Sequence, residues 1–155
     1  MLLFYLTFNN REQDFNQLSY KSLEHATDAI FEVNAENLED AFVVAAKSVT
    51  ETILDTSTIE EHEEKTLTVR GKDLRYLLYN WLEEIIILTI TEGFAAKTVS
   101  IVIEKNSEYT ITAKFRGEKI DIKKHHFKVE IKAPTFHEME ITQNGAVYMR
   151  YLLDL

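Results

Sequence analysis

The sequence predicts a single α+β domain in two layers, with a mostly antiparallel sheet covered on one face by two packed helices. Two segments carry apolar residues at the i, i+3, i+4, i+7 spacing of a helix with one buried face. About seven short segments alternate apolar and polar residues, as half-buried strands do, and most are joined by hairpin signals. The chain has 155 residues, 45% of them apolar, which is enough for one core.

The first 19 residues are predicted to be an N-terminal extension, part of the domain or packed on it, and residues 20–155 the domain itself. Residues 1–8 are apolar, but they lack a basic flank and a small-residue cleavage site, so we expect a leading strand or ordered extension rather than a signal peptide. No apolar run reaches about 18 residues, so no membrane association is expected and the cytoplasm is the default location.

The composition restricts the classes of partner and site. The formal net charge is −9, from 26 acidic and 17 basic residues, which argues against strong direct binding to a nucleic-acid backbone. The absence of cysteine excludes disulfides and thiolate metal sites. No glycine-rich phosphate loop and no G-x-S-x-G elbow occur in the sequence.

The first half of the domain contains both predicted helices. A strand is expected from about residue 29, and Asn37 can cap a helix that stops near Leu54. The charged run 60–65 is best explained as a solvated face or loop. After a short strand at 66–70, Asp73 is expected to cap a second helix, which Gly93 closes. Trp81, on the apolar face of that helix, is predicted to be a core residue.

The second half is predicted to be rich in strands. Residues 99–103 and 109–115 form a hairpin, 117–125 a connecting loop, and 147–153 a final strand after the strong Asn144-Gly145 turn signal. His125 and His126 would point to opposite faces of a strand, so they could not chelate one ion together.

A further alternating segment, 127–133, precedes the only proline, Pro134, which should end the strand or mark a sheet edge. Lys132 then lies on the polar face at the end of that strand. Taken by itself, Lys132 is better explained as a solubilising surface lysine. Likewise Asp28, in a loop before the first strand, is by itself better explained as a turn-former.

Four segments, in order, resemble the archease family, small accessory factors of the RNA-splicing ligase RtcB. The signature step reads Lys132-Ala133-Pro134-Thr135-Phe136-His137 here. His25-Ala26-Thr27-Asp28 is similar to the family's His-Thr-Ala-Asp step, with the middle two residues reversed. The second helix matches except at Thr89 and Ile90, and Asp154 stands at the family's penultimate position. The resemblance runs from about Leu23 to the C-terminus.

The carboxylates of Asp154 and of the Leu155 terminus are neighbours, and with a third carboxylate from Asp28 they would suit Ca²⁺ or Mg²⁺. The alternative is that Asp154 is a frayed terminal residue. The resemblance implies that Asp28 and Asp154 bind calcium, with the Leu155 C-terminal carboxylate as a weaker ligand and Mg²⁺ or Mn²⁺ as substitutes. It also makes Lys132 the functional lysine. His25 and His137 are weaker candidates for the same ligase-activating role.

The function that follows from the resemblance is that of a metal-binding activator of RtcB, not an enzyme itself. It would promote guanylylation of the ligase and multiple turnover in tRNA splicing or RNA repair. The acidic composition fits a protein that touches the ligase rather than RNA. Two other classes remain open on the residues alone, a small divalent-metal-dependent phosphoesterase and a general chaperone.

Overall fold

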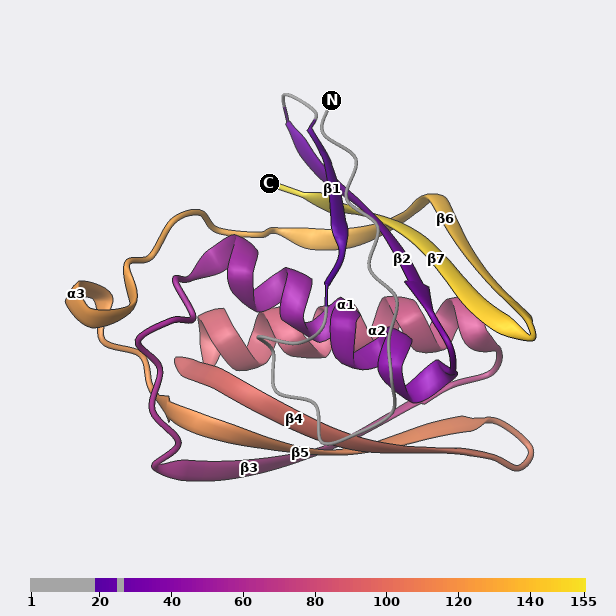
Figure 1. Cartoon of the computed structure of the whole chain (residues 1–155), viewed down its shortest axis with the longest axis horizontal. Helices are drawn as coiled ribbons and strands as arrows, with labels where there is room; N and C mark the ends of the chain where they lie inside the picture. Colours follow the sequence, from indigo (N-terminus) through magenta and orange to yellow (C-terminus); the bar gives the residue numbers. More distant parts are fainter. Residues whose placement is uncertain (1–18, 25–26) are drawn as a thin grey trace.

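The computed structural model describes residues 19–24 and 27–155 (Figure 1). Residues 1–18 of the predicted N-terminal extension and His25 lie outside the described residues. In chain order the elements are β1 (Lys21–Glu24), β2 (Asp28–Ala35), α1 (Leu38–Ile53), β3 (Glu63–Gly71), α2 (Leu74–Ile86), the π-helical turn η1 (Ile87–Thr91), β4 (Phe94–Lys105), β5 (Tyr109–Lys119), α3 (Ile122–His125), β6 (Ala133–Asn144) and β7 (Ala146–Asp154).

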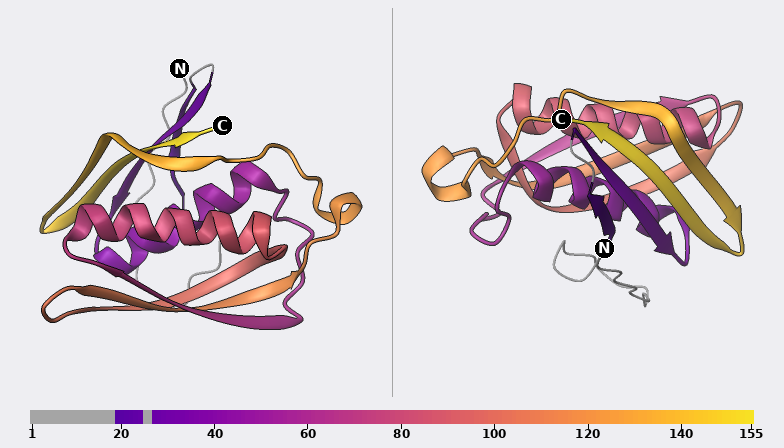
Figure 2. Two further views of the ribbon diagram at one scale, coloured as in Figure 1. Left: turned by 180° about the vertical axis from the view of Figure 1, so that it is seen from behind. Right: turned by 90° about the horizontal axis from the view of Figure 1, so that it is seen from above.

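The strands form two antiparallel sheets with α1 and α2 between them (Figures 1 and 2). Sheet B has the strand order β1-β2-β7-β6, and sheet A the order β3-β5-β4. The α+β class, the antiparallel pairing and the packing of both helices on one face of a sheet are confirmed. The strands divide into two sheets rather than one, so the same helices cover one face of each and form a middle layer.

The helix α1 is buried around most of its circumference, as a helix packed between two sheets should be. Its buried residues include Lys47, Ser48 and Thr50 as well as the apolar ones. A helix that covered a single sheet would keep a polar face in water, whereas a helix packed between two sheets is buried on both sides. The hydroxyls are accommodated locally, since Thr50 Oγ1 donates to the Ala46 carbonyl (3.1 Å).

The predicted helix caps are confirmed. The Asp40 amide donates to Asn37 Oδ1 (2.8 Å) at the start of α1, and α1 ends with Leu54 as its C-cap. The Tyr76 amide donates to Asp73 Oδ1 (2.9 Å) at the start of α2. Gly93, just beyond η1, has a φ of 66°, a left-handed conformation that glycine adopts without strain.

Two local predictions around β6 are wrong. Residues 127–132 form no strand, and β6 begins at Ala133, because this segment crosses from the layer of sheet A to that of sheet B (Figure 1). Pro134 is the second residue of β6, which is the outermost strand of sheet B, so the alternative prediction that it marks a sheet edge is confirmed. The predicted loop 117–125 contains the end of β5 and the short helix α3.

Trp81 is a core residue, as predicted, and it joins three elements. It is fully buried on α2, its Nε1 donates to the Phe42 carbonyl of α1 (2.8 Å), and its ring stacks on Phe115 of β5 at 5.8 Å between centroids. The helices of the middle layer are thus fixed to each other and to sheet A. No helix in the described part of the chain is long and apolar enough to cross a membrane.

Candidate functional site

The end of sheet B brings together residues that are far apart in the sequence. Asp28 at the start of β2 is the register partner of Asp154 at the end of β7, and Ala133 of β6 pairs with Asp154 from the other side. Residues directly opposite in an antiparallel pair project from the same face, with Cβ atoms about 4.5–5.5 Å apart. The two carboxylates therefore lie side by side on the outer face of the sheet.

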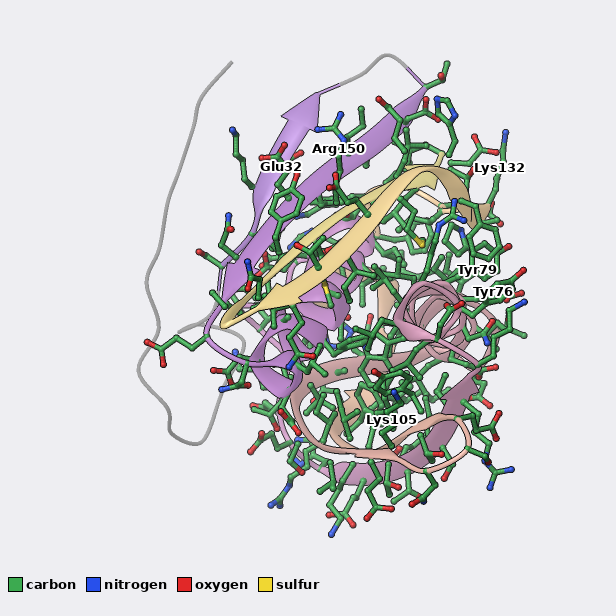
Figure 3. The ribbon with its side chains drawn as sticks, turned by 90° about the vertical axis from the view of Figure 1, so that its right-hand side faces the viewer. Glu32, Tyr76, Tyr79, Lys105, Lys132 and Arg150 are labelled. Carbon is green, nitrogen blue, oxygen red and sulfur yellow. The ribbon has the colours of Figure 1, made fainter. Side chains whose placement is uncertain are left out.

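Backbone hydrogen bonds attach Lys132 and the last residue to the same place. The Lys132 amide donates to the Asp154 carbonyl (2.8 Å), and the Leu155 amide donates to the Thr27 carbonyl (3.2 Å). Lys132 precedes β6, so it is held here by this bond and not by a place in a regular strand. Its side chain is exposed beside the end of β7 (Figure 3), and it makes no ion pair with any described residue.

The charges on the outer face of sheet B differ between its middle and its end. In the middle, Glu32 is opposite Arg150, with 3.0 Å between Oε1 and Nη1, and Arg150 also lies 3.6 Å from Glu138 (Figure 3). At the end, Asp28 and Asp154 place two carboxylates directly opposite each other. Paired carboxylates are the hard oxygen donors that Ca²⁺ and Mg²⁺ accept, so the residues fit such an ion.

His137 does not join this group. It follows Thr135, whose partner across the sheet is Leu152, so it lies further along β6 than the position opposite Asp154. Its side chain is 75% exposed, and its Nε2 lies 4.0 Å from Glu138 Oε2. Of the ligase-activating candidates in the described residues, Asp28, Asp154 and Lys132 are together, and His137 stands apart.

A second group of potential metal donors lies near α3, where the sequence suggested only a solvated charge run and a loop. Donor atoms of Glu60, His62 and Glu118 all lie within 4.8 Å of one another. Two carboxylates and an imidazole are donors that divalent metal ions accept. Glu60 and His62 are two residues apart in the irregular segment before β3. That spacing was the only signal in the sequence, because Glu118 reaches them through the β3–β5 pairing.

Lys124 places an ammonium group between these carboxylates. Its Nζ is 2.7 Å from Glu118 Oε1 and 3.1 Å from Glu60 Oε2. Hydrogen bonds to the two carboxylates raise the pKa of Lys124 above its ordinary value. Burial opposes ionisation of Glu118, but hydrogen bonds from Lys124 and His125 outweigh it, so the pKa of Glu118 is lowered. An ion binding here would have to displace Lys124.

His125 supports this group from inside the protein. It is fully buried, its Nδ1 accepts from the Asp121 amide (2.9 Å), and its Nε2 therefore carries the proton and donates to Glu118 Oε1 (2.8 Å). The prediction that His125 and His126 lie on opposite faces of a strand is wrong in its premise. They lie at the end of α3, where His126 is exposed with a φ of 51°.

Replacing this buried histidine should destabilise the fold measurably. We expect His125→Leu to lower the free energy of unfolding by about 2 kcal/mol, because it leaves the Asp121 amide unpaired and removes a donor to Glu118. The matched control is His126→Asn, which changes the exposed neighbour to a residue that tolerates its left-handed backbone, and should have little effect. Urea unfolding of both variants checks this, and equal stability of the two would contradict it.

Known proteins with similar sequences and structures identify the family of this chain. The model of the archease protein family matches residues 20–155. The archease of Pyrococcus abyssi is 36% identical over 123 residues, 79% of this chain and 87% of its own. That of Pyrobaculum islandicum is 36% identical over 141 residues, 89% and 96% of the two chains. The solution structure of Methanobacterium thermoautotrophicum protein 1598 superposes with a TM-score of 0.77, at 33% identity, over 88% of this chain and 98% of that one. The chain therefore belongs to the archease family.

Proposed function

We propose that this chain is a metal-binding accessory protein that activates an RNA-splicing ligase of the RtcB type and has no turnover of its own. The observation that carries the proposal is the register pairing of Asp28 with Asp154, next to Lys132. In this proposal Asp28 and Asp154 hold one divalent ion, Ca²⁺ by preference, with Mg²⁺ or Mn²⁺ as substitutes. The α-carboxylate of Leu155 is a further ligand if the protein ends there.

The chain's own residues have distinct tasks in this account. The hydrogen-bonded ends of β2 and β7 fix the two carboxylates before any partner arrives, so no ordering of the backbone is needed on binding. A bound ion would supply positive charge for phosphate oxygens of the ligase-bound nucleotide. Lys132 adds a compact, exposed cation beside it, of the kind that binds phosphate as a point charge.

The charge balance supports a protein partner over RNA. The chain carries a formal net charge of −9, and the negative pair at the end of sheet B is repelled by a phosphate backbone unless a metal ion intervenes. We therefore place the contact on the ligase, in the cytoplasm, during tRNA splicing or RNA repair. In this proposal the contact speeds guanylylation of the ligase and allows each ligase molecule to carry out several turnovers.

A nucleotide-transfer assay with purified ligase tests this function. Labelled GTP is mixed with the ligase, with and without the chain, and covalent guanylylation is followed over time in the presence of Ca²⁺. We expect faster labelling and more than one ligation per ligase. Phosphoester hydrolysis by the chain alone, lost in Asp154→Ala, would instead identify a phosphoesterase. Suppression of aggregation of unrelated proteins, with no effect on the ligase, would identify a chaperone.

A further inference from the structure

The edge strand β6 departs from regular pairing immediately after Thr135. The register with β7 changes from Thr135 opposite Leu152 to Glu140 opposite Arg150, so residues 136–139 face a single residue of β7. We call residues 136–139 the β6 bulge. Glu138 within it has a φ of 56°, a left-handed conformation that non-glycine residues rarely adopt. Bulges at sheet edges commonly redirect a side chain, and a strained residue is a reason to look for a function.

Residues of α2 hold the β6 bulge through one aromatic ring. The ring of Phe136 stacks on Tyr79, with centroids 4.2 Å apart and planes 9° apart, and it contacts Tyr76 at 5.1 Å. The Arg75 guanidinium carbon lies 5.1 Å from the centroid of the same ring, and Arg75 Nη2 donates to the Phe136 carbonyl (3.0 Å). Arg75 thus holds both the side chain and the backbone of Phe136.

The contacts of α2 with Phe136 also constrain the next residue, His137. The His137 amide donates to Thr135 Oγ1 (3.1 Å), while its side chain is 75% exposed. The backbone of the β6 bulge is therefore held on two sides, and the imidazole it carries projects into solvent. Figure 3 labels Lys132, which precedes β6, and Tyr76 and Tyr79 of α2, on which the β6 bulge packs. A fixed, exposed imidazole five residues after Lys132 in the chain is suited to contact a partner that also reaches Lys132.

We propose that Arg75 is a positioning residue, which holds the β6 bulge so that His137 is ready to contact the ligase. This inference rests on the proposed function. Arg75 acts through Phe136, because its guanidinium is already engaged with the ring and the carbonyl of that residue. Without Arg75 the bulge would have to be ordered when the ligase binds, and ordering a few residues costs binding affinity. The effect falls on the affinity for the ligase and leaves the activated rate unchanged.

A double-mutant cycle tests this role in the guanylylation assay. Arg75→Ala should raise the concentration of the chain that gives half-maximal stimulation by about tenfold and leave the maximum unchanged. His137→Ala should raise it at least as much, and Arg75→Ala should have no further effect in the His137→Ala background. Arg116→Ala, which removes an exposed arginine from β5, is the matched control and should behave as wild type.

Hydrogen exchange in the isolated chain provides a readout that does not need the ligase. Arg75→Ala should speed the exchange of the amides of residues 136–139, and Arg116→Ala should not. Unchanged exchange, unchanged half-maximal concentration, or additive effects of Arg75→Ala and His137→Ala would each overturn the proposed role. If the wild-type chain failed to stimulate the ligase at all, the proposed function would fall, and this role with it; the other outcomes overturn the positioning role alone.

Discussion

Lys132→Ala is expected to reduce the stimulated rate of ligase guanylylation by about a hundredfold, the lower end of the range for removing one positioned donor from a developing negative charge. The lysine side chain is exposed and unpaired among the described residues, so its loss should leave the fold and the metal affinity unchanged. The rate at saturating chain is the quantity to measure, because it separates activation from binding.

Lys123→Ala is the matched control for this variant. Lys123 is also exposed, but it lies on α3, away from the end of sheet B, and its ammonium makes no ion pair with the described residues. Both variants lose one positive charge, so a general electrostatic effect would change them equally. Equal stimulation by the two variants would mean that Lys132 is an ordinary surface lysine.

Trp81→Ala is expected to produce the largest loss of stability, about 3–5 kcal/mol in the free energy of unfolding. The substitution leaves a cavity where α1, α2 and β5 meet, and it leaves the Phe42 carbonyl without its donor. That loss is a large fraction of the stability of a domain of this size. Urea unfolding monitored by circular dichroism measures it.

Val102→Ala serves as the reference for truncation of an apolar side chain. Val102 lies on β4 and is 57% exposed, so its truncation should change stability by less than about 0.5 kcal/mol. A Trp81→Ala variant as stable as Val102→Ala would show that α1 and α2 are not fixed to sheet A through this residue.

The local elements were predictable from the sequence because their signals are local. Asn37 and Asp73 each lie immediately before a helical apolar pattern, and the structure uses both as caps. The hairpin at Asn144-Gly145 likewise depends on neighbouring residues, and Gly145, between β6 and β7, has a positive φ of 78°. The division into two sheets was not predictable, since it depends on which strands pair across the chain, β2 with β7 and β3 with β5.

The candidate site was predictable only in part for the same reason. Family resemblance selected Asp28, Lys132 and Asp154, but nothing local to them shows that β2 and β7 are neighbours in register. The group around Glu118 had no such resemblance to select it. Its members come from the segment before β3, from β5 and from α3, so only the folded chain brings them together.

Isothermal titration calorimetry with Ca²⁺ tests most directly whether Asp28 and Asp154 bind one ion together. We predict that the wild type binds one Ca²⁺ per chain. Asp28→Asn and Asp154→Asn should each abolish this binding, and the double variant should behave like either single variant. Glu60→Gln, which alters the second group of donors, should bind as the wild type does. Calcium binding that survives Asp154→Asn, or that disappears only in Glu60→Gln, would contradict a metal site at the end of sheet B.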